Sequence, residues 1–168
     1  MTLQKWQERV PEEAHLFNPA FCGALLYEFI RSYTKAKDDH VDFPLPFCAL
    51  PLALHPASRD RLPYSTVTSL YTWLEENADM RVDYAARARS LAPYVREALR
   101  FTIGRNAIAL NANGQLQLGS KRASFPDSYL DGMTPEIKEI VTATRKVARW
   151  FGAAGETATI MTAWGVRL

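Results

Sequence analysis

The sequence predicts a mainly α-helical protein with one small β-hairpin, an α+β arrangement in which a winged-helix-like core is flanked by N- and C-terminal helices. Apolar residues recur at helical spacing in several segments, most clearly over 17–37. The stretch 107–118 instead alternates apolar with small or polar residues around an Asn-Gly pair, which is a hairpin signature. At 168 residues the chain fits a single domain, 1–168, with the winged-helix-like segment 65–118 inside it.

The first long helix is predicted to begin at Pro19, because Asn18 can cap it and proline suits the first helical position. Its apolar face is formed by Phe21, Leu25, Leu26, Phe29, Ile30 and Tyr33. The following segment, 43–56, is strongly apolar but is interrupted by prolines at 44, 46, 51 and 56. We expect it to be extended at first, then to form one short helix buried against the first helix.

Residues 65–104 predict three consecutive helices. Ser65 is expected to cap the first helix, Asp83 to cap the second, and Pro93 to begin the third, which Gly104 ends. The inward residues of the first of these helices are Val67, Leu70, Tyr71 and Leu74.

The hairpin that follows allows two registers. A two-residue loop would place Leu110 opposite Gln117 and send the leucines of the two strands to opposite faces. A three-residue loop ending at Gly114 pairs Leu110 with Leu116 and gathers the apolar residues on one face, so this register is favoured. Three helices followed by a hairpin is the order of a winged helix-turn-helix, whose third helix reads DNA.

The C-terminal part predicts one more long helix. Thr134 and Pro135 begin it, the glycines after Phe151 end it, and its inward residues recur at helical spacing. The apolar tail 157–168 carries Trp164 and is expected to dock on the core. Its pattern does not separate helix from strand, although a short helix is favoured.

No sequence motif for catalysis or for a cofactor is present. Cys22 and Cys48 lie in apolar runs and are interpreted as buried thiols, while the three histidines are too far apart for a local metal-ligand pair. Phosphate-binding glycine loops and nucleophile elbows are both absent. Adjacent carboxylates such as Glu12 and Glu13 lie in polar stretches and are expected to be solvated. We therefore expect a protein that is not an enzyme, binds no metal and carries no cofactor.

The beginning of the chain lacks the basic start and apolar stretch of a signal peptide, and no apolar run approaches the roughly 20 residues of a membrane-spanning helix. These features predict a cytoplasmic protein that does not enter a membrane.

A basic surface is the strongest candidate for binding. The formal net charge of +2 gives no general preference for nucleic acid, so local clustering has to decide. Possible contacts to nucleic acid or to an acidic protein partner are Arg96, Arg100, Arg105, Lys121 and Arg122. Arg96 and Arg100 are four residues apart and share a helix face, although Glu97 lies beside them.

Four strings together resemble one family, the middle component of bacterial three-component ABC systems. They are residues 12–21 (EEAHLFNPAF), 44–55 (PLPFCALPLALH), 96–99 (REAL), and 148–152 (ARWFG) with Thr159-Ile160 and 164–167 (WGVR). The resemblance spans nearly the whole chain, but no string is a chemical motif, so the ordered set carries the specificity. One departure is Leu168, where family members usually have a proline after Gly-Val-Arg.

The resemblance implies an accessory protein encoded beside an SMC/RecN-like ABC ATPase and an effector component, in systems directed at phage or other invading DNA. It brings no catalytic residues. The leading hypothesis is an adaptor that couples the ATPase to the effector, with DNA or RNA as a further possible partner. The alternatives are a stand-alone winged-helix DNA-binding transcription regulator, which would dimerise, and an enzyme whose polar residues converge only in space.

Overall fold

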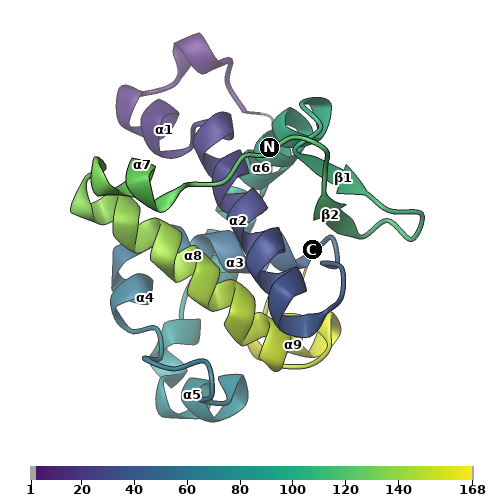
Figure 1. The fold of residues 1–168 in the computed structure, drawn as a ribbon. Helices are drawn as coiled ribbons and strands as arrows, with labels where there is room; N and C mark the ends of the chain where they lie inside the picture. Colours follow the sequence, from purple (N-terminus) through teal and green to yellow (C-terminus); the bar gives the residue numbers. More distant parts are fainter. Residues whose placement is uncertain (1–2, 168) are drawn as a thin grey trace.

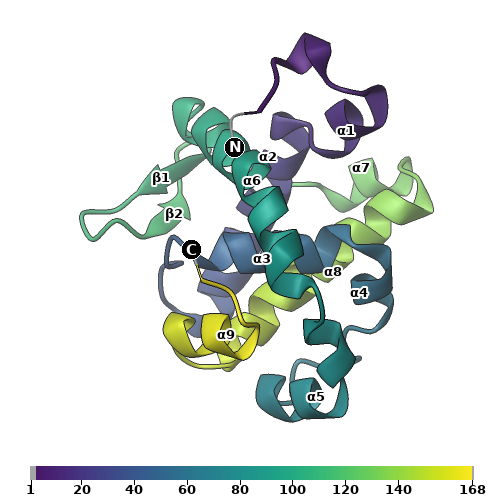
Figure 2. The same ribbon diagram turned by 180° about the vertical axis from the view of Figure 1, so that it is seen from behind.

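Three long helices and one shorter, fully buried helix form the centre of the protein. The structure is a computed structural model that describes residues 3–167. Helices α2 (Pro19–Lys37) and α3 (Leu45–Leu54) both pack against α6 (Tyr84–Gly104) and α8 (Pro135–Ala153). Figure 1 shows α8 crossing α2 on one side, and the reverse view in Figure 2 shows α6 crossing α3 on the other. The buried apolar side chains form one continuous cluster between these helices.

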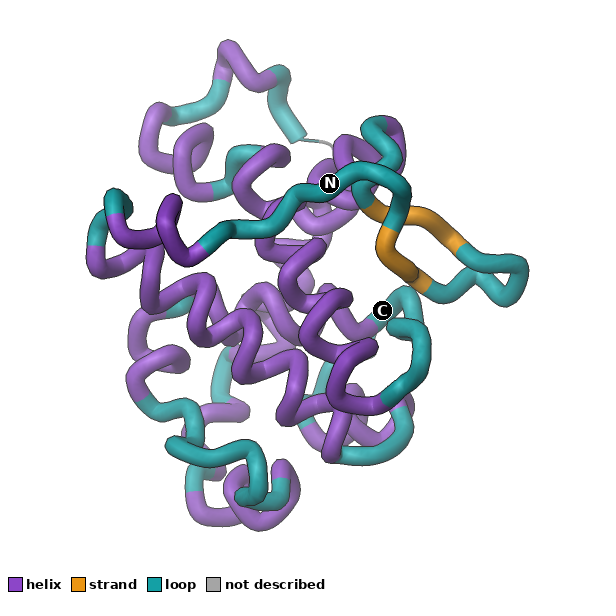
Figure 3. The backbone as a smooth tube through the Cα atoms, in the orientation of Figure 1, coloured by secondary structure: helices purple, strands orange, loops and turns teal. Residues whose placement is uncertain are grey.

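Shorter elements surround this centre, and within residues 3–167 strands are confined to one hairpin (Figure 3). The mainly helical class with a small hairpin is therefore confirmed. The shorter elements are η1 (Trp6–Glu8), α1 (Pro11–Leu16), α4 (Pro56–Asp60), α5 (Leu70–Glu76), η2 (Ala78–Arg81), β1 (Ile108–Leu110), β2 (Leu116–Leu118), α7 (Asp127–Asp131) and α9 (Thr157–Ala163). None of the described helices is long and apolar enough to span a membrane.

Helix α2 begins and packs as predicted. The Asn18 side chain accepts hydrogen bonds from the backbone N–H groups of Ala20 and Phe21, at 2.8 and 3.3 Å. These bonds satisfy two of the donors that a helix start leaves without an intrahelical partner. The helix ends where Asp38 adopts a left-handed conformation with φ 56°.

Helix α3 corrects the expectation of an extended beginning. All of Leu45–Leu54 is one helix and every residue in it is buried, so the expected burial is confirmed while the expected shape is wrong. Pro46 lies in the first turn, where a missing N–H costs nothing. Pro51 lies inside the helix, and the Tyr84 hydroxyl donates a hydrogen bond to the Cys48 carbonyl in the turn before it. Burial on every side outweighs the backbone hydrogen bond that Pro51 cannot make.

The first of the three predicted helices starts later than expected. Helix α5 begins at Leu70, with Ser69 rather than Ser65 at the cap position, and Val67 is 91% exposed instead of buried. The Ser65 hydroxyl accepts from the Val67 N–H in a local turn, and the Thr68 carbonyl accepts from the Trp150 indole N–H at 2.7 Å. These bonds hold the segment in a turn and prevent an earlier helix start.

The boundary predicted at Pro93 is wrong. Residues 84–104 form the single helix α6, with Pro93 inside it. The buried face continues across the proline through Ala88, Ala92 and Val95, so packing offsets the loss of one backbone hydrogen bond. Segment 65–118 therefore contains a short helix, a 3-10 turn, one long helix and a hairpin. The separate third helix on which the winged-helix interpretation depended is not formed.

The hairpin has the predicted register. Leu110 pairs with Leu116 and Ile108 with Leu118, around a loop in which Gly114 has a left-handed φ of 76°. Val41 bridges to the other side of Leu116. Only Ile108 and Leu116 are buried, while Leu110 and Leu118 stay 48% and 37% exposed. The apolar face of the hairpin is thus half covered.

The C-terminal predictions are confirmed over the described residues. Thr134 accepts a hydrogen bond from the Ile137 N–H at 3.5 Å at the start of α8, and the tail forms the short helix α9. Trp164 is buried at its end, where the chain turns at Gly165 with φ 66°. The tail therefore docks on the core.

Candidate functional site

The five basic residues selected from the sequence do not form one cluster. Arg96 and Arg100 are both exposed on α6 and line one hollow. The Arg105 guanidinium lies 4.5 Å from the centre of the Phe101 ring. Lys121 follows the hairpin, where its backbone N–H donates to the Asn106 carbonyl, and Arg122 lines a second hollow. Only the α6 pair lines a common hollow, whereas Lys121 meets the Arg105–Asn106 turn through its backbone.

The first hollow lies between α6 and the N-terminal segment, has a volume of about 480 Å³, and is called the α6 hollow below. Its lining comprises Leu3, Gln4, Lys5, Trp6, Arg9, Pro93, Arg96, Glu97 and Arg100. The Arg9 guanidinium donates two hydrogen bonds to the Glu97 carboxylate, at 2.7 and 2.8 Å. It also lies within 6 Å of the Trp6 and Tyr94 ring centres. The hydrogen bond and the negative charge of Glu97 raise the pKa of Arg9.

The second hollow lies between α2, α8 and the linker that follows β2, has a volume of about 570 Å³, and is called the α2–α8 hollow. It shares no lining residue with the α6 hollow. Its cations come from all three parts of the chain, and only two carboxylates lie among them. The charged lining residues are Arg31 and Lys35 with Glu28 on α2, Arg122 and Asp127 from the linker to the start of α7, and Arg145 and Arg149 on α8.

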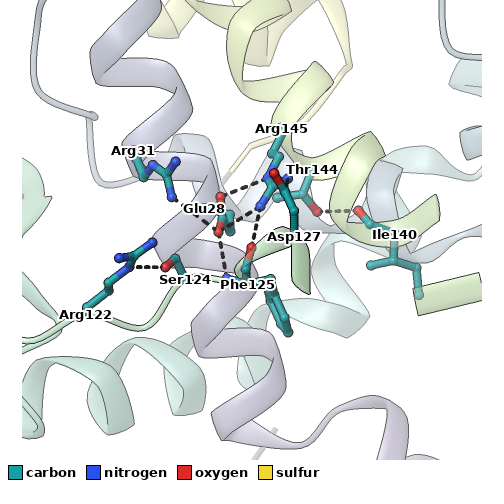
Figure 4. Close-up of polar contacts among 9 residues, drawn as sticks. All are labelled: Glu28, Arg31, Arg122, Ser124, Phe125, Asp127, Ile140, Thr144 and Arg145. Atoms are coloured by element: carbon teal, nitrogen blue, oxygen red, sulfur yellow. Dashed lines mark hydrogen bonds and ion pairs between the residues drawn. The ribbon is translucent and has the colours of Figure 1, made fainter. Parts of the chain in front are cut away.

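Glu28 is the central group of this second hollow, between Arg31 and Arg145 (Figure 4). Its side chain is only 1% exposed. The carboxylate accepts hydrogen bonds from Arg145 at 3.0 and 3.2 Å and from the Phe125 N–H at 2.8 Å, and Arg31 lies 3.7 Å away. Arg145 also donates to the Phe125 carbonyl at 2.8 Å. Glu28 thus fixes both the guanidinium of α8 and the backbone of the linker.

Four of these cations, Arg31, Lys35, Arg145 and Arg149, did not emerge as site residues from the sequence. The signal that points to them is Glu28 itself, which occupies a position surrounded by apolar residues of α2. A buried carboxylate requires a cation or several hydrogen-bond donors, so its presence in a core helix predicts a partner elsewhere in the chain. Nothing in the local sequence identifies that partner as Arg145, which is 117 residues away.

The cysteines and histidines among residues 3–167 are not arranged for catalysis or for metal binding. Burial raises the pKa of both Cys22 and Cys48 to about 12, which keeps these thiols protonated and unreactive. Within that range no three His, Cys, Asp or Glu side chains gather as a metal site would require. His55 contacts the Ser58 hydroxyl at 3.0 Å, and burial together with the charges of Arg87 and Arg59 lowers its pKa. Neither cysteine and none of the three histidines lines either of these two hollows, whose polar lining is mainly charged.

Comparison with known proteins gives one match. A family model described as "ABC-three component (ABC-3C) system Middle Component 3" matches residues 6–168. The match covers almost the whole chain, including the elements that line both hollows. No curated protein and no solved structure matches the chain.

Proposed function

Because this chain belongs to the Middle Component 3 family of ABC-three component systems, we propose that it is a non-enzymatic adaptor that couples an SMC/RecN-like ABC ATPase to an effector component. The family match over residues 6–168 is the observation that carries this proposal. The two hollows support it because they are lined by charges suited to binding and hold no arrangement of nucleophile and base.

The packing of the long helices is consistent with coupling. ATP binding and hydrolysis in an ABC ATPase change the separation of its nucleotide-binding heads, and an adaptor must pass this movement to a partner. A protein transmits such movement best when its helices share one tightly packed core, as α2, α3, α6 and α8 do here. The movement would then pass through the protein as a displacement of a rigid body.

The proposal extends to the role of the whole system. We place the protein in the cytoplasm, in a conflict system that acts against phage or other invading DNA. Deleting this chain from an active system should then restore phage plating to the level of cells that lack the system. Unchanged protection in the deletion strain would contradict this part of the proposal.

A stand-alone winged-helix regulator is the weaker alternative. It would require a separate recognition helix followed by the hairpin, whereas residues 84–104 form one continuous helix. It would also act without an ATPase. The family match favours the adaptor.

Affinity purification tests the adaptor directly. We expect a tagged version of this chain, expressed with the other two components and treated with nuclease, to retain both the ATPase and the effector. The nuclease step is needed because the basic hollows could otherwise hold the components together through nucleic acid. Recovery of the chain alone, or with neither component in a fixed ratio, would refute the adaptor role.

A further inference from the structure

We propose that the α2–α8 hollow binds phosphate groups of a nucleic-acid backbone. This inference deepens the proposed function by naming one partner, but it concerns the isolated chain and does not require the coupling role. It keeps Arg122 from the residues selected by sequence and moves the other contacts from α6 to α2 and α8.

The cations of this hollow are arranged in two helical pairs. Arg31 and Lys35 are four residues apart on α2, and Arg145 and Arg149 are four residues apart on α8. Residues at this spacing lie on the same helix face. The two helices pack against each other, and near their C-terminal ends a Cβ atom on Gly152 of α8 would lie 3.5 Å from the Ala36 Cβ of α2. Both pairs line the same hollow, so four cations face it from adjoining helices.

A fifth cation comes from the linker between β2 and α7. The Phe125 backbone is held from both sides, its N–H by Glu28 and its carbonyl by Arg145, so the linker lies against the helices (Figure 4). This attachment brings Arg122 to the edge of the hollow, where its guanidinium donates to the Ser124 hydroxyl at 2.5 Å. The cations therefore approach from three directions. A tetrahedral phosphate, whose oxygens point in different directions, suits such an arrangement better than a planar carboxylate does.

Several of these charges have no internal partner among the described residues. Lys35 and Arg149 form no ion pair within 3–167, and the Nη1 atom of Arg145 has only the Asp127 carboxylate nearby, at 3.8 Å. Asp127 is 96% exposed and therefore well screened by water. Glu28 is buried and already occupied by Arg145 and Phe125. An anion that enters the hollow meets donors that are not yet satisfied.

The chemistry of the lining favours phosphate groups over nucleobases. Four of the five cations are arginines, whose planar guanidinium groups bind phosphate through paired N–H donors. The only aromatic residue in the lining, Phe125, is buried at 8% exposure, so no ring is available for a base to stack on. Recognition would therefore be of the backbone and independent of sequence. The volume of about 570 Å³ accommodates more than one phosphate.

Two double variants of equal charge test this assignment in the full chain. Lys35→Ala/Arg149→Ala removes two cations from the α2–α8 hollow, and Arg96→Ala/Arg100→Ala removes two from the α6 hollow. All four residues are exposed, so both variants should keep the thermal unfolding midpoint of the natural protein. The matched loss of charge removes any difference due to net charge alone.

The measurement is the affinity for a short fluorescein-labelled DNA duplex as a function of salt concentration, by fluorescence anisotropy. Each phosphate contact contributes about 0.9 to the slope of log affinity against log salt, so Lys35→Ala/Arg149→Ala should make that slope shallower by about two. Arg96→Ala/Arg100→Ala should leave the slope unchanged. Inorganic tripolyphosphate should compete with the duplex for the natural protein.

Three results would overturn the assignment. One is an equal slope for Lys35→Ala/Arg149→Ala and the natural protein, and another is an equal loss in both double variants. The third is binding of a poly-glutamate peptide, with no binding of duplex, that is lost in Lys35→Ala/Arg149→Ala, because the hollow would then serve an acidic protein. Since the isolated chain is used, these results are independent of whether the ATPase and effector co-purify.

Discussion

The two basic hollows are built around arginine–glutamate pairs that are oriented in opposite ways. In the α2–α8 hollow the acid is buried and the arginine is the more exposed partner, with side chains 1% and 24% exposed for Glu28 and Arg145. In the α6 hollow the arginine is the buried partner, with side chains 2% and 32% exposed for Arg9 and Glu97. The first pair hides its negative charge from an incoming ligand, while the second presents it.

This difference leads us to expect weaker anion binding at the α6 hollow than at the α2–α8 hollow, although both carry arginines at helical spacing. Arg96 and Arg100 have the right spacing, but Glu97 lines the same hollow and remains partly exposed. The Arg96 guanidinium also lies 5.8 Å from the centre of the Phe47 ring, which engages one of its faces. The potential that a ligand meets depends on which charges stay accessible, and the count of basic residues does not reveal this.

The largest expected effect is a difference in stability between variants that remove the arginine from each pair. Arg145→Met leaves Glu28 buried without its main counter-ion, and we expect it to lower the free energy of unfolding by about 3 kcal/mol. Arg9→Met leaves Glu97 able to turn to water, and we expect a loss of about 1 kcal/mol or less. Urea denaturation of both variants measures the difference. Equal losses would mean that the burial of the acid does not distinguish the two pairs.

The α2–α6 and α2–α8 helix contacts should also differ in how well they tolerate an added methyl group. At the α2–α6 crossing, a Cβ on Gly23 would lie 2.4 Å from the Thr102 Cγ2, so Gly23→Ala should cost about 1 to 3 kcal/mol. At the α2–α8 crossing, a Cβ on Gly152 would meet only ordinary contacts at 3.5 Å and beyond. Gly152→Ala should therefore be neutral, or stabilising by about 0.5 kcal/mol through higher helix propensity. Thermal unfolding of the two variants is the test, and a destabilised Gly152→Ala would show that the α2–α8 contact is tighter than its distances indicate.

A smaller effect is expected at the N-terminal segment. Glu97→Gln removes the negative charge beside the buried Arg9 but keeps one acceptor oxygen, and we expect about 1.5 kcal/mol of destabilisation. Since Arg9 anchors residues before α1 to α6, limited proteolysis should cut this segment faster in the variant. Unchanged proteolysis would indicate that the packing of Arg9 against Trp6 and Tyr94 is sufficient without the charge.

The smallest effect concerns the exposed acid of the α2–α8 hollow. Asp127→Asn removes one negative charge that lies 3.8 Å from Arg145, and should raise the affinity for duplex by about twofold while leaving stability unchanged. Anisotropy at low salt detects this change. A fall in affinity would show that Asp127 orients Arg145 for binding rather than competing with the ligand.

Local signals in the sequence predicted some element ends and not others, since Ser65 does not cap α5 and Asp83, although it precedes α6, makes no side-chain cap bond. Asn18 and Thr134 both cap the helices that they were expected to cap, and Gly114 fixed the hairpin register through its positive φ. Pro51 and Pro93 were expected to interrupt helices, but both lie inside one, because a proline is tolerated when the surrounding helix face is buried. Propensity is a local property, and burial is decided by residues distant in the chain.

Most residues of the α2–α8 hollow could not be predicted from local sequence, because they come together only through contacts between distant parts of the chain. Of the residues selected from the sequence, only Arg122 lines the α2–α8 hollow. The hollow arises where α8 packs on α2 and where Glu28 pairs with an arginine 117 residues away. The one sequence signal for such a partner is the carboxylate of Glu28 in the apolar core of α2, and it was not used in the sequence analysis.

Removal of this chain from the assembled system tests the central claim most directly. The ATPase component carries the affinity tag, the effector is co-expressed, and purification after nuclease treatment is compared with and without this chain. An adaptor predicts that the effector is retained only when this chain is present, and that retention survives in Lys35→Ala/Arg149→Ala, whose defect lies in nucleic-acid binding. Retention of the effector by the ATPase in the absence of this chain would contradict the adaptor role.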